Sequence, residues 1–153
     1  MHDSTDTPRS AQTGHRAPRT HLTLTVVLFV SGAEALPLRA RFAYDTADPL
    51  AIRMGFLDAP DEVRPWAFSR DLLYTGLRTR AGEHAVQVWP PCRCHSTTMV
   101  RIVLRGGGAA AVLYVPAAEL KSWLEETFAL VPVGEEGAHL RLDESLEELL
   151  RQR

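Results

Sequence analysis

The segment Cys92-Arg93-Cys94-His95 contains the residue types most often found at metal and thiol sites. Thiolates and imidazoles are zinc ligands, but a structural zinc site has four ligands, and its paired cysteines are usually separated by two to four residues. Only Arg93 separates Cys92 from Cys94, and no second Cys/His cluster follows. Cys92, Cys94 and His95 are therefore candidate metal ligands that the spacing does not favour, and we expect no metal and no cofactor. A reactive thiol stays an alternative, because a neighbouring guanidinium lowers a thiol pKa.

The hydroxyl groups of Ser96-Thr97-Thr98 directly follow His95, as a nucleophile and its base sometimes do. A hydrolase of this kind needs a sharply turned nucleophile, often flanked by glycines, and an acidic residue that orients the histidine. The sequence places neither of them here. Gly106-Gly107-Gly108 has no adjoining lysine and is predicted to be a hairpin turn, not a phosphate-binding loop. We therefore expect a protein that is not an enzyme.

The segment from Tyr44 to Pro49 places two carboxylates, Asp45 and Asp48, three residues apart. Paired carboxylates do acid–base chemistry or bind cations. Aspartates followed by proline also build turns, because the carboxylate accepts hydrogen bonds from nearby backbone N–H groups. The sequence favours the turn.

Three aromatic residues, Trp66, Phe68 and Trp89, lie in the Arg-rich stretch 64–105. Aromatic rings among arginines can stack the bases of single-stranded nucleic acid, and a whirly-like protein of that class is the alternative function. The same rings are ordinary core residues, and the formal net charge of −2 gives no overall attraction to nucleic acid. We expect these rings in the core. Residues 64–105 carry more basic than acidic side chains, whereas residues 106–153 carry more acidic than basic ones. The acidic excess either forms a patch that attracts a partner or only keeps the chain in solution.

The N-terminal region contains a pattern that resembles a secretory signal. The apolar run 22–30 follows two arginines and precedes Ala33-Glu34-Ala35, a segment typical of a cleavage site. Leucine and valine alternate with threonine over residues 22–26, however, which is typical of a half-buried strand. We therefore expect a cytoplasmic protein with a disordered tail over 1–20 and a single domain over 21–153.

The spacing of apolar residues predicts strands first and helices after them, twice over. Such an order favours an α+β domain with an antiparallel sheet that helices cover on one face. Ser69 is predicted to cap a short helix that Gly76 ends in the left-handed conformation, and Pro65 is predicted to place its strand at a sheet edge. The predicted strands are 21–31, 36–45, 50–57, 63–68, 83–89, those around Val100–Leu104 and Ala111–Val115, and 138–142; the predicted helices are 70–75, 116–130 and one that follows Asp143.

Three segments in order carry a family resemblance. They are Tyr44–Pro49, the run Trp66–Leu73 with Gly76, and Val86–Pro90. In order and spacing they resemble the signature blocks of the SsgA-like proteins, and the likeness extends over about 21–150. The 20-residue tail, the Cys92–His95 loop and the triple-glycine turn depart from the family pattern.

The resemblance implies a non-catalytic adapter that controls sporulation-specific cell division at septa, through septum placement or remodelling of the septal wall. It implies a homotrimer of whirly-like subunits with a repeated ββββα plan. It also implies contact with a division protein such as FtsZ or with a paralogue. Four polar members of the blocks are candidate partner contacts that could equally brace turns and a helix start: Tyr44, Asp48, Arg70 and Asp71.

Overall fold

The computed structural model describes residues 17–31, 34–59, 65–106 and 108–137. The predicted tail lies almost wholly outside these residues. The strand expected at 138–142 and the final helix also lie outside them.

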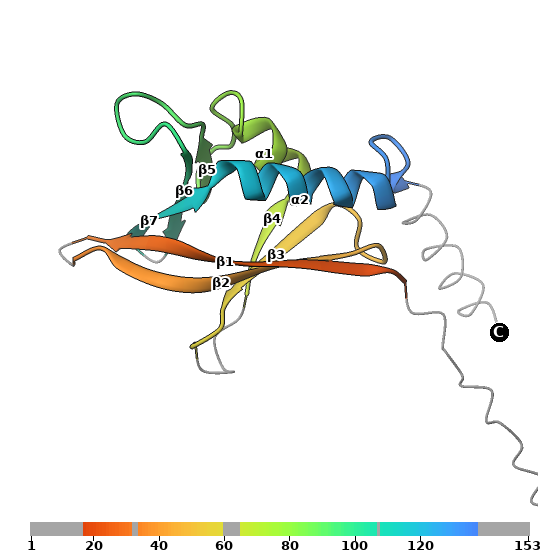
Figure 1. The fold of residues 1–153 in the computed structure, drawn as a ribbon, viewed down its shortest axis with the longest axis horizontal. Helices are drawn as coiled ribbons and strands as arrows, with labels where there is room; N and C mark the ends of the chain where they lie inside the picture. Colours follow the sequence, from red (N-terminus) through yellow and green to blue (C-terminus); the bar gives the residue numbers. More distant parts are fainter. Residues whose placement is uncertain (1–16, 32–33, 60–64, 107, 138–153) are drawn as a thin grey trace, which may run out of the picture.

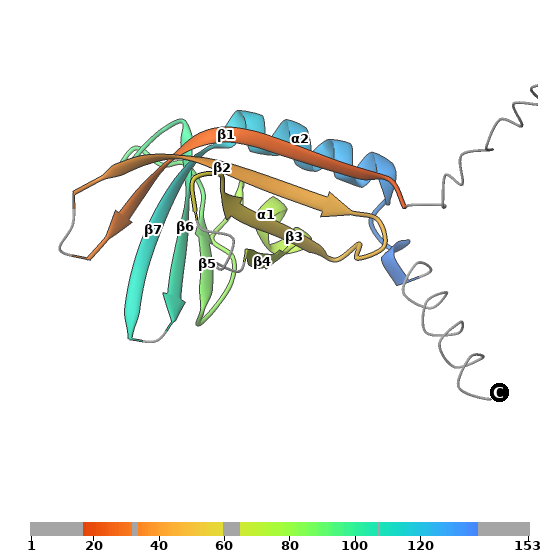
Figure 2. The ribbon, with the colours of Figure 1, turned by 90° about the horizontal axis from the view of Figure 1, so that it is seen from below.

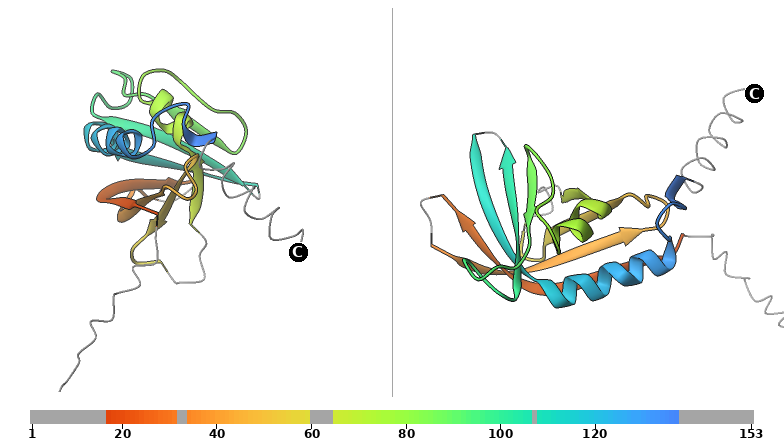
Figure 3. Two further views of the ribbon diagram at one scale, coloured as in Figure 1. Left: turned by 90° about the vertical axis from the view of Figure 1, so that its right-hand side faces the viewer. Right: turned by 90° about the horizontal axis from the view of Figure 1, so that it is seen from above.

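Seven strands form one antiparallel sheet in the order β4-β3-β2-β1-β7-β6-β5. The sheet is strongly curved, so that β5, β6 and β7 run across the direction of β2 (Figures 1 and 3). The ββββα plan followed by βββα agrees with the predicted order and with the predicted α+β class. The strands are β1 Arg19–Val30, β2 Leu36–Asp45, β3 Ala51–Phe56, β4 Trp66–Ser69, β5 Val86–Trp89, β6 Met99–Gly106 and β7 Ala109–Pro116.

Strand β1 lies at the centre of the sheet. It pairs with β2 from Arg19 to Leu28 and with β7 from Val27 to Val30. Its side chains alternate as the sequence predicts, because Leu24 and Val26 are buried while Thr25 between them is exposed. The run that resembles a secretory signal is thus a strand of the sheet.

Two helices lie on one side of β1 and β2 (Figure 1). Helix α1, Arg70–Gly76, packs against both edge strands, β4 and β5, and so spans the gap between the two ends of the curved sheet. Helix α2, Ala117–Leu130, buries Leu120, Trp123 and Leu124 in the core. No helix among the described residues has the length and apolar composition that a membrane-spanning helix needs.

Gly76 does not end α1 in the left-handed conformation, and that prediction is wrong. It is the last helical residue, and the described glycines with positive φ are Gly82, Gly108 and Gly134. A Cβ at Gly76 would lie 2.2 Å from Cγ1 of the buried Val88 on β5. Glycine stands here because the helix approaches the strand too closely for any side chain.

The three aromatic residues have different environments. Phe68 is buried, as predicted. Trp66 is 37% exposed, so its assignment to the core is wrong: it lies at the start of β4, an edge strand of the sheet that the described residues form. Trp89 is partly buried at the opposite edge, on β5.

Candidate interaction surface

The Tyr44–Pro49 segment is a turn, as predicted. The Ala47 N–H donates to Asp45 Oδ1 at 2.9 Å, and the buried Tyr44 hydroxyl donates to the Pro49 carbonyl at 3.0 Å. The two carboxylates are not paired with each other, because Asp45 binds Arg19 and Asp48 binds Arg53 across exposed ion pairs. This arrangement holds the end of β2 to the start of β3.

Arg70, the first residue of α1, lies in the interior with a side chain only 1% exposed. Its Nη1 donates to the Thr127 carbonyl at 3.0 Å, and its Nη2 donates to Glu136 Oε1 at 2.7 Å. The guanidinium also packs over the rings of Phe128 and Tyr44, at 4.1 and 5.0 Å from their centroids. One side chain thus ties together β2, α1, α2 and the segment that follows α2.

The ionisation of this cluster favours a charged pair. Hydrogen bonds from the backbone N–H of Glu136 itself, from the Arg70 side chain and from the Gly134 N–H hold the pKa of the Glu136 carboxyl below its usual range, against the opposing effect of burial. Burial raises the pKa of the Tyr44 phenol, so it stays protonated and donates to Pro49. Sequence reasoning missed Glu136, because nothing local links it to a residue 66 positions earlier.

The four candidate contact residues therefore fall into two pairs. Tyr44 and Arg70 are buried and brace the fold, which was the alternative left open for them. Asp48 is half-buried and Asp71 is exposed, and Asp71 stands in the first turn of α1, where the helix dipole favours an anion. For these two, a role in partner contact stays a prediction.

The Cys92–His95 loop is closed by backbone bonds, with the Cys92 N–H donating to the Ser96 carbonyl at 2.8 Å. Both thiols are free, with Cys92 partly buried and Cys94 exposed. Burial alone would raise the Cys92 pKa, but hydrogen bonds from the backbone of Cys94 and His95 bring that pKa below its usual value. Among the described residues no three Cys, His, Asp or Glu side chains gather as metal ligands would.

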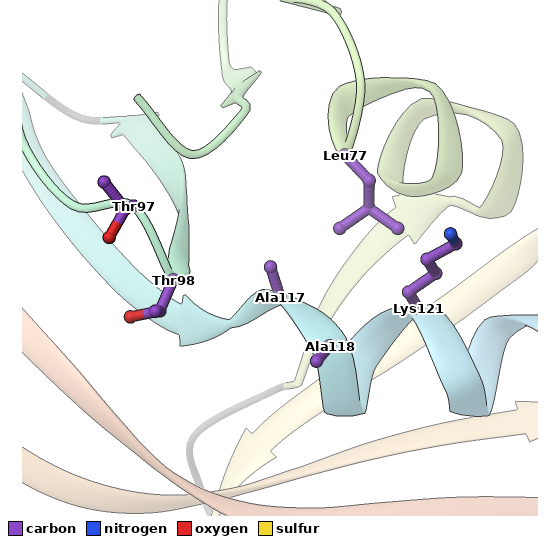
Figure 4. A pocket seen from close by; sticks show the side chains of 6 residues that line it. All are labelled: Leu77, Thr97, Thr98, Ala117, Ala118 and Lys121. Atoms are coloured by element: carbon purple, nitrogen blue, oxygen red, sulfur yellow. The ribbon is translucent and has the colours of Figure 1, made fainter. Parts of the chain in front are cut away.

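Ser96 has a structural role at the end of the same loop. Its Oγ accepts from the N–H groups of Thr98 and Met99, at 3.3 and 3.1 Å. A hollow of about 330 Å³ lies beside it, between the end of α1 and the start of α2 (Figure 4). The residues that line it are Leu77, Thr97, Thr98, Ala117, Ala118 and Lys121.

The outer face of the sheet, which turns away from α1 and α2, has two chemically different halves (Figure 2 shows β1 and β2 from this side). The apolar half lies on the end of β1 and on β7 and β6. Its members are Val27, Phe29, Val103, Val112 and Tyr114, which pair across the strands. Phe29 is 40% exposed and packs edge-on against Tyr114 with ring centroids 5.2 Å apart.

The basic half of the outer face lies on β2 and β3 and carries Arg39, Arg41 and Arg53, all exposed. The sequence signal was present in the alternation of Arg39 and Arg41, which puts both on one face of a strand. Sequence reasoning looked instead to residues 64–105, where Arg70 is buried and where Arg80 and Arg101 pack on the Trp89 ring, 4.6 and 5.3 Å from its centroid. That stretch does not form one basic patch.

Comparisons with known proteins agree on one group of relatives. A family described as "Streptomyces sporulation and cell division protein, SsgA" matches residues 38–136. The chain is 42% identical to the sporulation-specific cell division protein SsgB of Streptomyces coelicolor over 80% of its own length and 89% of that protein. It is 37% identical to the SsgB protein of Frankia casuarinae over 80% and 85% of the two chains.

Two solved structures share the fold. One comes from work on SsgB mutations that correlate to longitudinal cell division during sporulation of Streptomyces coelicolor, with a TM-score of 0.72, 39% identity, and coverage of 82% of this chain and 98% of that one. The other is an SsgA-like sporulation-specific cell division protein from Thermobifida fusca, with a TM-score of 0.76, 32% identity, and coverage of 87% and 96%.

Proposed function

Because this chain belongs to the SsgA family of sporulation and cell division proteins, we propose that it is a non-catalytic adapter that acts at sporulation septa through protein–protein contacts. The observation that carries this proposal is the outer face of the sheet, which no described helix covers and which presents an apolar and a basic half side by side. A face of this kind fits partner binding, since soluble proteins rarely leave contiguous apolar surface without a use. Its partners are a second copy of the chain and a division protein such as FtsZ or a paralogue.

The apolar half suits self-association. Phe29 is 40% exposed and contacts Tyr114, and Val27, Val103 and Val112 lie beside them on the same face. Aromatic and aliphatic side chains in a contiguous patch are typical of the buried core of an interface. A whirly-like homotrimer that buries this patch follows as the proposed assembly.

Phe29→Glu is expected to abolish the trimer, because it places a carboxylate in the centre of the apolar half. Light scattering after size exclusion should then give the mass of one 17.0 kDa chain instead of three. Thr25→Glu is the matched control, since Thr25 points outward from the same strand but pairs with Arg39 instead of β7. A wild-type protein that is monomeric at high concentration would remove the proposed assembly.

A fluorescent fusion to the full chain is expected to form ladders or foci at septa in sporulating hyphae. This is the result expected if the protein is cytoplasmic and is recruited to the division machinery. Deletion of the gene is expected to disturb the spacing of sporulation septa. Diffuse or nucleoid-associated fluorescence, together with normal spore chains in the deletion strain, would count against the adapter. Nucleoid signal would favour the single-stranded nucleic-acid alternative.

A further inference from the structure

A trough runs along the basic half of the outer face, and the strand register explains it. Arg41 on β2 stands opposite Gly55 on β3, and Arg53 on β3 stands opposite Ala43 on β2. Each long side chain therefore faces a residue with little or no side chain, which leaves the floor open between two guanidinium groups. Two adjoining hollows of about 290 and 400 Å³ share Arg41, Ala43 and Arg53 in their lining.

Among the described residues, only part of the charge on this trough is paired. Arg53 makes an exposed ion pair with Asp48, and Arg19 makes one with Asp45, at 3.0 and 2.9 Å. Arg41 makes no ion pair with any described residue, and the same is true of Arg39, two positions earlier on the same face. Guanidinium groups bind carboxylates through two parallel N–H donors, so a carboxylate is the natural ligand between Arg41 and Arg53.

The other end of the trough is apolar. The smaller hollow is lined there by Phe56, Leu57 and Pro65, and Leu57 is 45% exposed. A ligand that fills both ends therefore carries a carboxylate and an aliphatic or aromatic group a few ångströms apart. Nucleic acid fits less well, because its bases prefer a platform of exposed aromatic rings, whereas this end of the trough offers Leu57, Pro65 and the partly buried Phe56.

We infer that this trough binds an acidic segment of a partner protein, with a carboxylate between Arg41 and Arg53 and the neighbouring apolar side chain against Phe56 and Leu57. The inference rests on the proposed adapter function and names the chemistry of the partner segment. We expect the partner segment to be extended where it crosses the trough, because the trough runs along the strands β2 and β3.

Fluorescence anisotropy with the purified full chain tests this inference. The probe is a labelled twelve-residue peptide that alternates glutamate and leucine. Binding is expected to weaken about tenfold or more in Arg41→Gln/Arg53→Gln, because two charge-assisted contacts are lost. Gly55→Val should weaken it similarly by filling the floor, while its Cβ meets only Pro65 at 3.9 Å, an ordinary contact. Arg105→Gln, an exposed arginine on β6, is the matched control and should bind as the wild type does.

Other probes separate the alternatives. A glutamine–leucine peptide and a glutamate–serine peptide should both bind more weakly than the probe, since each lacks one of the two chemistries. Equal binding of either peptide, or tighter binding of an oligothymidine or of phosphatidylglycerol vesicles, would overturn the inference. So would unchanged peptide affinity in both Arg41→Gln/Arg53→Gln and Gly55→Val, with wild-type circular dichroism.

The septal fusion distinguishes failure of the trough from failure of the adapter function. If the wild-type fusion reaches septa and the peptide does not bind, the trough inference falls and the proposed function stands. If the wild-type fusion is diffuse, the proposed function falls whatever the peptide does. Loss of septal foci in Gly55→Val, with foci kept in Arg105→Gln, would support both the trough inference and the proposed adapter function.

Discussion

Replacing Glu136 with alanine is expected to lower the free energy of unfolding by about 3–5 kcal/mol, the usual cost of removing one partner of a buried ion pair. The substitution leaves the Arg70 guanidinium, 1% exposed, without its carboxylate and with only the Thr127 carbonyl and two rings around it. Urea denaturation monitored by tryptophan fluorescence measures the change.

Arg19→Ala is the control for Glu136→Ala, because it breaks an ion pair whose arginine side chain is 64% exposed. Exposed pairs contribute about 0–1 kcal/mol. If Glu136→Ala costs no more than Arg19→Ala, the interior pair does not hold the end of α2 in solution. Glu136→Gln keeps the shape and one hydrogen bond, and it is expected to fall between the two.

The same pair gives the stability a defined pH dependence. The folded-state pKa of Glu136 is lowered, so its contribution is fully present above the unfolded pKa of a glutamate, about 4.3, and is lost as the pH falls through the lower folded value. Urea midpoints should therefore fall more steeply below about pH 4.3 in the wild type than in Glu136→Gln. Parallel curves would mean that Glu136 titrates normally in the folded chain.

Gly76→Ala is expected to destabilise the protein by about 1–3 kcal/mol, the cost of inserting a methyl group into a packed core. Alanine in a helix would otherwise be favoured over glycine by about 1 kcal/mol. The new Cβ would lie 2.2 Å from Cγ1 and 2.4 Å from Cβ of the fully buried Val88, so the helix or the strand must shift. Thermal or urea unfolding of the variant measures the effect.

Val88→Ala provides the test of mechanism for Gly76→Ala. Alone it is destabilising, because it removes methyl groups from a fully buried residue. In its background Gly76→Ala should cost less than in the wild type, because the Cγ1 contact at 2.2 Å is gone, although the Val88 Cβ at 2.4 Å remains. Strictly additive free energies in the double-mutant cycle would show that the two sites do not touch.

The strands were predictable from sequence because their alternation is a local property. Leu24 and Val26 on β1, and Val100 and Ile102 on β6, repeat with period two, and the pleat buries them together. Ser69 was predictable as a helix cap for the same reason, and its Oγ accepts from the Leu72 N–H.

The role of Gly76 and the shape of the trough could not be predicted from local sequence, because both depend on contacts between distant segments. A glycine after a short helix gives the same local signal for a left-handed stop as for a close approach, and only the packing of α1 on β5 decides between them at Gly76. The arginines that the trough takes from β2 could be predicted from the spacing of Arg39 and Arg41, which places both on one face of the strand. The open floor of the trough could not be predicted, because it depends on the strand register that places Arg41 opposite Gly55.

The central place of β1 has a consequence for the order in which the chain folds. Its pairing with β2 joins neighbours in sequence, whereas its pairing of Val27 with Tyr114 closes a loop across most of the domain. Long loops cost more conformational entropy to close, so we expect the contact between β1 and β7 to form late in folding. Until the ribosome has released β7, the edge of β1 near Phe29 is an unpaired, apolar strand edge. The nascent chain is then most prone to aggregate, before the sheet is complete.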